Sequence, residues 1–242
     1  MKNIKTTGIV IAENSLGDSD KILTILTPNI GKITCTAKGA KRPKSTLLAG
    51  SQLLCFGEYV LRKSNDMYSI QSCDPIEVFY DIRTDLDKLN YTSTILRIIT
   101  DVTTENQNNY HILKLFLNTL YIISESDKNL DFIISVFKIR LLKILGYAPN
   151  VDYCVECGKK DEQLTGFSIK GDGFKCSSCS KMDKSCINIS EGSKYAIIYS
   201  LKADSKKIFS FNISELALKE FELISRLYFN EKLEKEYKIN NL

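Results

Sequence analysis

Hydrophobic and polar residues alternate along the first eighty positions, which is the period of a β-strand. Turn-forming Gly, Pro, Asn and Asp residues interrupt the alternation and leave five short segments. These segments are residues 6–12, 21–27, 33–37, 53–62 and 67–73. Five short strands joined by turns predict a small barrel, because closing the sheet removes its exposed edges. Pro75 ends the alternation.

After residue 84 the hydrophobic period becomes that of a helix. The apolar residues of a first helix share one face; they are Leu86, Leu89, Ile95, Ile98, Ile99 and Val102. A second helix is expected over 111–124 and a third over 130–145. The third is apolar around most of its circumference, so we expect a central, buried helix. Gly146 is its expected C-terminal cap.

Two more helices are predicted near the C-terminus. Ser190 can cap the first of them, which carries Ile198 and Leu201. Asn212 and Glu215 have the spacing of a capping box, and an apolar helical face follows them. These patterns place helices on both sides of a cysteine-rich segment.

That segment contains two C-x-x-C pairs, whose cysteines are Cys154, Cys157, Cys176 and Cys179. Each pair lets two thiolates from one turn reach the same metal, and two pairs complete the tetrahedron that Zn²⁺ prefers. Four protein ligands leave no open position, so one structural zinc ion is predicted. It would contribute about 10–16 kcal/mol to the folding of its own module. Cys186 can also replace Cys179 as the fourth ligand, but two C-x-x-C turns make the simpler site.

The predicted fold class is therefore α+β with several domains. The β-barrel domain is expected over 1–80 and the zinc-binding module over 151–186. The helical domain is expected in two parts, 81–150 and 187–242, with the zinc module inserted between them. No low-complexity linker separates these parts.

Overall composition indicates an ordinary globular protein. The chain has 242 residues, of which 43% are hydrophobic and 26% are charged. It has no apolar stretch long enough to cross a bilayer and no signal peptide is expected at Met1, so no membrane association is predicted. Cys35, Cys55 and Cys73 lie singly in apolar segments, which suits the reducing cytoplasm.

Residues that perform chemistry are scarce, and the chain is predicted not to be an enzyme. His111 is the only histidine and begins an apolar helix, where a structural or solvated role is expected. There is no phosphate-binding loop, no dinucleotide fingerprint and no His-x-Glu ahead of the cysteines. The paired carboxylates Asp18 and Asp20 lie in a turn and are expected to cap and solubilise it.

Positive charge is concentrated near the N-terminus, although the net charge is only +4. Residues 32–45 carry five basic side chains and no acidic one: Lys32, Lys38, Lys41, Arg42 and Lys44. If all five contacted phosphates of a single strand, log K would fall with log salt at a slope of about −3.5. The alternative is a solvated basic loop. Phe56, Tyr59 and Tyr68 on the predicted strands can stack on bases or pack in the core.

Two parts of the sequence are distinctive when taken together. The first part comprises Thr7-Gly8-Ile9-Val10, residues 16–27, Gly31-Lys32 and residues 37–45. The second is residues 138–149, which read Lys-Ile-Arg-Leu-Leu-Lys-Ile-Leu-Gly-Tyr-Ala-Pro and are followed closely by Cys154-x-x-Cys157. With these residues the chain resembles the RecO family of bacterial DNA repair proteins, and the resemblance extends over essentially its whole length.

The resemblance implies an N-terminal OB-fold barrel, a helical domain and an inserted zinc module. It also implies a recombination mediator that binds single- and double-stranded DNA and anneals complementary strands without catalysis. The implied partners are RecR and single-strand-binding protein, with a functional link to the recombinase RecA. The DNA-binding residues carried over are the five basic residues of 32–45, together with Lys21.

Two other functions remain open from the sequence. The chain can be a protein-binding repair adaptor in which barrel and zinc module serve as scaffolds. It can also be a metal-dependent enzyme acting on DNA, which would require a second metal with an open coordination position. The modest net charge leaves open how tightly the chain binds DNA by itself.

Overall fold

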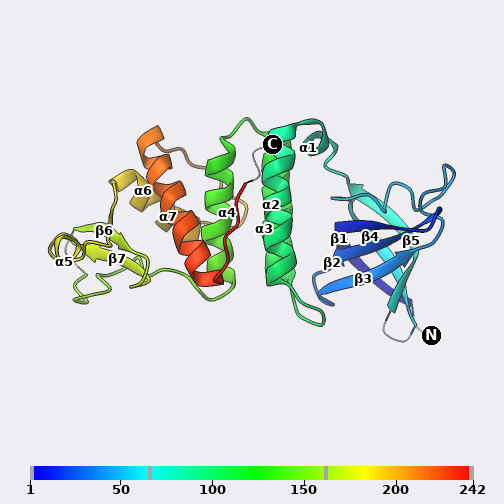
Figure 1. The fold of residues 1–242 in the computed structure, drawn as a ribbon, viewed down its shortest axis with the longest axis horizontal. Coiled ribbons are helices and arrows are strands. Elements are labelled where there is room, and N and C mark those ends of the chain that lie inside the picture. Colours follow the sequence, from blue (N-terminus) through cyan, green and yellow to red (C-terminus); the bar gives the residue numbers. More distant parts are fainter. Residues whose placement is uncertain (1–2, 65–66, 161–162, 240–242) are drawn as a thin grey trace. The chain divides into compact units, whose positions relative to one another are not determined.

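The structure is a computed structural model that describes residues 3–64, 67–160 and 163–239. The chain divides into two compact units (Figure 1). Unit 1 comprises the described residues up to Ser124 together with Ile239, and unit 2 comprises those from Glu125 to Lys238.

Unit 1 begins with five strands, which are β1 (Asn3–Leu16), β2 (Asp20–Leu26), β3 (Lys32–Ala37), β4 (Phe56–Ser64) and β5 (Met67–Glu77). They form a closed barrel in the order β1-β2-β3-β5-β4. All neighbouring pairs are antiparallel except β3 and β5, which are parallel. The five predicted strands are confirmed, but β4 begins at Phe56 instead of residue 53, and β5 continues past Pro75, its predicted end, to Glu77. β1 continues beyond the predicted Ala12 because residues up to Leu16 pair with β2.

The barrel core contains aliphatic side chains and the three single cysteines of this region; it includes Val10, Leu23, Ile25, Ile33, Cys35, Cys55, Tyr59, Leu61 and Cys73. The Tyr59 side chain is completely buried, and its hydroxyl donates to Gly50 O over 2.9 Å. Tyr59 is therefore a core residue and cannot stack on a base.

Three helices complete unit 1: α1 (Tyr80–Thr84), α2 (Leu86–Val102) and α3 (Tyr110–Glu125). The Asp85 side chain caps α2 by accepting from Lys88 N over 3.0 Å. The predicted first helix is confirmed as α2, and Leu86, the first member of its apolar face, lies at the exposed first turn and is 58% exposed.

The turn between β2 and β3 is bound to the connection between α2 and α3. Gly31 forms a β-bridge with Glu105, and Lys32 N donates to Thr104 O over 3.0 Å. Asn109 N donates to Pro28 O over 2.8 Å. These backbone bonds join the barrel and the helices into a single unit.

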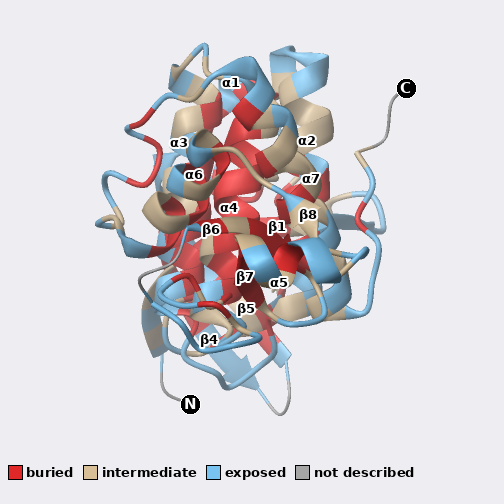
Figure 2. Cartoon of the chain, turned by 90° about the vertical axis from the view of Figure 1, so that its left-hand side faces the viewer, coloured by how far each residue is buried: buried red, intermediate tan, exposed pale blue. Residues whose placement is uncertain are grey.

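Unit 2 contains four helices, α4 (Leu130–Ile144), α5 (Ser177–Met182), α6 (Glu191–Lys202) and α7 (Glu215–Leu233). Its three short strands are β6 (Leu164–Ser168), β7 (Gly173–Cys176) and β8 (Ile187–Asn188). Figure 2 shows α4 coloured as buried along most of its length, as predicted, and it packs against α6 and α7. Gly146 follows α4 with a φ of 88°.

Caps and long side chains hold the helix ends of unit 2. Ser190 caps α6 as predicted, but Ser214 caps α7 by accepting from Ala217 N over 3.3 Å. The predicted capping box at Asn212 is wrong, because α7 begins at Glu215 and that residue therefore occupies the first helical position. Arg140 Nη1 donates to Leu201 O over 2.8 Å and so satisfies the C-terminal end of α6.

The cysteine-rich module packs its small sheet, in the order β7-β6-β8, against α7. Phe167 of β6 meets Tyr228 of α7 edge-on, with ring centres 5.4 Å apart. The Tyr228 hydroxyl donates to Tyr147 O over 3.2 Å. Among the described residues, no helix combines the length and the hydropathy needed to span a bilayer.

Candidate nucleic-acid interface and metal centre

Residues 38–45, which we call the basic loop, leave the barrel at the end of β3. The loop is fixed to the turn between β1 and β2. The Asp20 carboxylate accepts from Gly39 N over 2.7 Å, and Lys41 N donates to Ser19 O over 2.9 Å. The Lys41 ammonium donates to Gly17 O over 3.1 Å. Three contacts therefore hold the loop in one conformation at the barrel surface.

Lys38, Arg42 and Lys44 project from this loop and are exposed. None of the three makes a side-chain hydrogen bond or ion pair with any residue that the structure describes. Cations held in this way can contact phosphate groups without first breaking an internal contact.

Lys21 and Lys32 have partners within the fold. The Lys21 ammonium lies 2.7 Å from the Glu13 carboxylate and donates to Ser51 O over 3.1 Å. The Lys32 ammonium donates to Thr100 O over 2.6 Å, near the C-terminal end of α2, where a positive charge is favourable. Both contacts stabilise unit 1, and DNA contact by these two residues stays a prediction.

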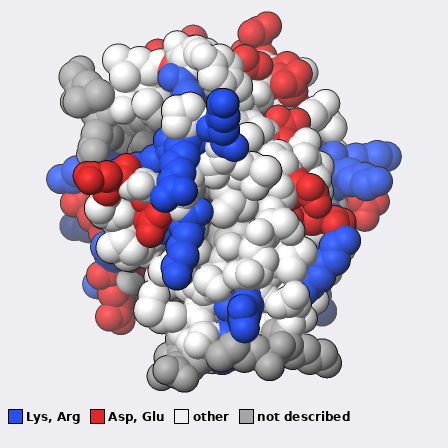
Figure 3. Space-filling view, turned by 90° about the vertical axis from the view of Figure 1, so that its right-hand side faces the viewer, with Lys and Arg blue, Asp and Glu red and all other residues white. Residues whose placement is uncertain are grey.

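Figure 3 views the barrel of unit 1 from outside. Lys and Arg side chains form a line on this face, with a broad area without charged groups on one side of the line and acidic side chains close to its other side and at the margins. A line of cations along a surface can follow the backbone of a nucleic-acid strand.

The two remaining aromatic candidates differ in exposure. Phe56 at the start of β4 is half-buried. Tyr68 of β5 is 8% exposed, and the Lys63 ammonium lies 5.4 Å from its ring centre. Tyr68 is thus held by core packing and by a cation–π contact.

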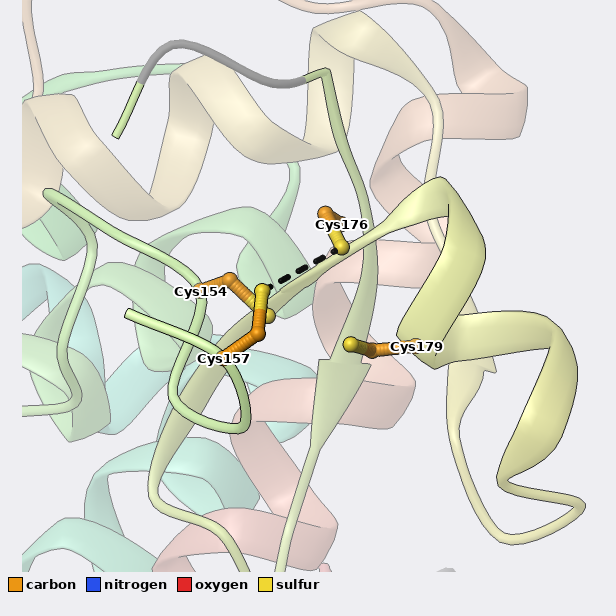
Figure 4. Close-up of side chains that lie close together, drawn as sticks. All are labelled: Cys154, Cys157, Cys176 and Cys179. Carbon is orange, nitrogen blue, oxygen red and sulfur yellow. Dashed lines mark hydrogen bonds between the residues drawn. The ribbon is translucent and has the colours of Figure 1, made fainter. Parts of the chain in front are cut away.

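Figure 4 shows the four cysteines of the predicted metal site with their sulfur atoms turned toward one another. Cys154 and Cys157 lie in a turn closed by a 2.8 Å bond from Gly158 N to Cys154 O. Cys176 ends β7, and Cys179 lies on α5. All four Sγ atoms lie within 4.8 Å of one another.

These distances fit a tetrahedral zinc site. A Zn–S bond of about 2.3 Å places the sulfur atoms of a tetrahedron about 3.8 Å apart. The Sγ atoms of Cys157 and Cys176 are 3.8 Å apart. Among the described residues, these cysteines form the only cluster of three or more candidate metal-binding side chains.

The protonation of the cluster also favours a cation. Burial acts to raise the pKa of the Cys154 thiol, but backbone hydrogen bonds from Cys176, Cys157 and Glu156 outweigh burial and lower it to about 6. Hydrogen bonding with Cys176, together with burial, raises the pKa of Cys179 to about 12. Without a metal, therefore, Cys179 favours the protonated thiol at neutral pH, whereas a bound divalent cation would stabilise its thiolate.

Sequence reasoning missed the side chain that links the two cysteine turns. The Lys175 ammonium lies 2.8 Å from Glu156 and 2.9 Å from Asp183, and its pKa is raised by the hydrogen bonds with these carboxylates. Glu156 lies between the first two cysteines, and Lys175 precedes the third. No spacing rule relates residues so far apart in the chain.

Cys186 and His111 lie outside this cluster. Ser180 Oγ donates to Cys186 Sγ over 3.3 Å, so Cys186 has a hydrogen-bond partner of its own. His111 is exposed at the start of α3, where Tyr110 meets its ring edge-on.

Comparison with known proteins places both units in one family. The family described as "Recombination protein O N terminal" matches residues 1–79, and "Recombination protein O C terminal" matches residues 83–240. Similar curated proteins are named "DNA repair protein RecO". The one from Acetivibrio thermocellus is 47% identical over 98% of this chain and 94% of its own length.

Two further relatives with the same name are more distant. The protein from Alkaliphilus metalliredigens is 34% identical and covers 85% of this chain and 83% of its own. The protein from Caldicellulosiruptor bescii is 32% identical and covers 99% of this chain and 97% of its own length. Neither the family descriptions nor these names describe an enzyme, in agreement with the scarcity of reactive residues.

Proposed function

The chain belongs to the RecO family of DNA repair proteins, and from this premise we propose that it is a DNA-binding recombination mediator. The observation that carries the proposal is the basic loop, which presents Lys38, Arg42 and Lys44 without side-chain partners among the residues that the structure describes. Such cations bind backbone phosphates and read no base sequence.

The barrel is proposed to be an OB-fold. Its strand order, β1-β2-β3-β5-β4, its closure and its five strands support this assignment. OB-folds commonly bind single strands across one face, and the basic loop adjoins such a face. The proposal keeps the domain ranges predicted from the sequence: the barrel over 1–80, the helical domain over 81–150 and 187–242, and the zinc module over 151–186.

The metal module is proposed to bind one zinc ion through Cys154, Cys157, Cys176 and Cys179. Bound zinc would balance the negative charge of the four thiolates and would join the turn of Cys154 and Cys157 to the end of β7 and to α5. It would take no part in a reaction. Lys175 holds the two turns together through Glu156 and Asp183.

Annealing follows from the same charges. Two DNA strands repel each other, and cations on the protein reduce this repulsion while the bases stay free to pair. The helical region is proposed to bind RecR and single-strand-binding protein, and so to help load RecA onto coated DNA. Cytoplasmic location, at the nucleoid during repair, is part of the same proposal.

The test is to replace Lys38, Lys41, Arg42 and Lys44 together with alanine and to titrate labelled single-stranded DNA over a salt series. We expect weaker binding and a log–log salt slope that becomes shallower by about 2.1 for the three unpartnered cations, and by about 2.8 if Lys41 also exchanges Gly17 O for a phosphate. Strand-annealing rates should fall in parallel.

A matched variant removes the same charge from exposed lysines of unit 2: Lys184, Lys206, Lys207 and Lys219. It should lose much less affinity. Equal losses of DNA affinity in the two variants would show that binding depends on the net charge of the protein and not on the basic loop. Binding to single-strand-binding protein with no affinity for DNA at low salt would favour the adaptor function.

A further inference from the structure

Two of the single cysteines, Cys55 and Cys73, meet in the barrel core of unit 1. Cys55 directly precedes β4, and Cys73 of β5 is the strand partner of Tyr59. The Tyr59 hydroxyl donates to Gly50 O over 2.9 Å and to Cys55 O over 3.2 Å. Gly50 in turn lies against Cys73, because a Cβ at position 50 would overlap the Cys73 sulfur. Two thiols and a phenol therefore share one small region of the core.

The segment that leads to Cys55 is held in a strained conformation. Leu54 has a φ of 64°, which a bulky residue adopts only where its surroundings hold it. Leu54 N donates to Val10 O over 2.9 Å, and Val10 N donates to Cys55 O over 3.0 Å. The Arg83 guanidinium donates to Leu53 O. These contacts fix the backbone from which the Cys55 side chain projects.

The groups around the pair favour one ionised sulfur. Hydrogen bonding with Cys73 lowers the pKa of the Cys55 thiol. The Tyr59 hydroxyl and the positive charge of Arg83 also lower this pKa, whereas burial and Glu77 oppose them. Hydrogen bonding with Cys55 raises the pKa of Cys73, so the pair loses one proton from Cys55 and keeps the other on Cys73. A thiolate beside a second thiol and a cation is typical of cysteines that react with oxidants.

Access to the pair is restricted to small molecules. Cys55 is completely buried and Cys73 is 8% exposed. Hydrogen peroxide is little larger than water and can reach these sulfur atoms through local fluctuations of the barrel, whereas a bulky disulfide reagent cannot. The third single cysteine, Cys35, is also completely buried, and burial raises its pKa to about 12. It therefore stays protonated and unreactive.

We propose that Cys55 and Cys73 are a peroxide-sensitive thiol pair that closes to a disulfide and cross-links β5 to the start of β4. The thiolate attacks one oxygen of hydrogen peroxide, the O–O bond breaks, and a sulfenic acid and hydroxide form. The second thiol then attacks the sulfenic sulfur, an S–S bond replaces the S–O bond, and water leaves. The hydroxide takes up the proton lost when the pair ionised. Two thiols are thus oxidised, and one peroxide is reduced to two water molecules.

The disulfide would close the hairpin of β4 and β5 at its base. Such a cross-link stabilises a fold mainly because it restricts the unfolded chain. The barrel should therefore become more stable in the presence of an oxidant that also damages DNA. The reaction needs no DNA, so it does not depend on binding by the basic loop.

The test is to treat the full chain with increasing hydrogen peroxide, alkylate the remaining thiols in denaturant and map every cysteine by mass spectrometry. We expect peptides joined through Cys55 and Cys73 at peroxide concentrations that leave Cys35 reduced. The melting temperature should rise by at least about 5 °C, and dithiothreitol should reverse the rise.

Single variants separate this disulfide from other effects of peroxide. Cys73→Ala should remove the cross-link and the rise in melting temperature. Cys35→Ala, a matched change of a buried cysteine on β3, should keep both. In the unaltered protein, oxidation of Cys35 at the same peroxide concentration as the pair, or oxidation of Cys55 or Cys73 to sulfinic acid without a cross-link, would overturn the proposal. So would free thiols at both positions after peroxide treatment. These readouts use no variant, so they hold even if the variants fold poorly.

Discussion

The Asp20 carboxylate accepts a hydrogen bond from the backbone amide of Gly39, with Oδ1 2.7 Å from the nitrogen. A negative charge therefore lies at the base of the loop that we propose to bind DNA. Gly39 has a φ of 66°, a conformation that glycine adopts without strain, and the carboxylate fixes it there. Asp20 is a positioning residue for Lys38 and Arg42.

Replacement of Asp20 is expected to weaken DNA binding although it removes a negative charge. Asp20→Ala frees the Gly39 amide, and the loop must then be ordered when DNA binds. A hydrogen bond of this kind contributes about 0.5–1.5 kcal/mol or more, so affinity should fall about threefold. Asp18→Ala is the control. Asp18 is exposed, and its replacement removes the same charge while the hydrogen bond from Gly39 to Asp20 stays in place. A rise in affinity for both variants would show that only charge matters.

Two cysteine variants test the ligand set. Cys186→Ser should retain one zinc ion per chain, because Cys186 is bonded to Ser180 and lies outside the cluster. Cys179→Ser removes one of four ligands and should lower zinc content and the melting temperature. Metal content by mass spectrometry and melting in the presence of a chelator measure both effects. Metal loss in Cys186→Ser would overturn the assignment.

Two glycine variants test the junction between barrel and helices. Gly31 has a φ of 83°, and a Cβ there would overlap Thr104 O. Gly31→Ala is therefore expected to lower the free energy of unfolding by about 2–4 kcal/mol. Gly17 has a φ of 61° with open space around it, so Gly17→Ala should cost only about 1–2 kcal/mol. If the two variants shifted the urea midpoint equally, the overlap of a Cβ at Gly31 with Thr104 O would have no measurable cost.

Lys138 of α4 should make unit 2 less stable at neutral pH than at alkaline pH. It is 4% exposed, and burial lowers its pKa to about 8; Glu222 opposes this effect and Arg226 adds to it. Because the unfolded pKa is higher, the unfolded state binds more protons between about pH 8 and 10.5. Stability should therefore rise through that range.

Lys138→Met isolates this effect. Its stability relative to the unaltered protein should be highest near pH 7 and should fall by a difference on the order of 3 kcal/mol by about pH 10.5. Lys219→Met, at an exposed position of α7, should show no such trend. Parallel melting curves for Lys138→Met and the unaltered protein across this pH range would contradict a buried ammonium.

The strands, the long helices and the cysteine ligand set follow from spacings along the chain. Alternation over a few residues defines β2 or β3, and the apolar circumference of residues 130–145 already indicates a buried helix. C-x-x-C turns are equally local, because the backbone between two cysteines restricts where their sulfur atoms point. Helix boundaries do not follow from local spacing alone: the sequence predicts Asn212 as the cap of the last helix, whereas Ser214 caps it because α7 begins at Glu215.

The availability of each basic residue was decided only by the tertiary structure. The sequence places Lys21 and Lys32 beside Lys38 and Lys44 as equals, but Glu13 and Thr100 lie close enough to bind the first two. The barrel closes in the same way, through the pairing of β3 with β5, two strands that are not neighbours in the sequence. The sequence by itself therefore determines the local elements and the two cysteine pairs of the proposed metal site through covalent spacing. Which charges and surfaces face solvent depends on contacts between distant segments, and those form only when the chain is folded.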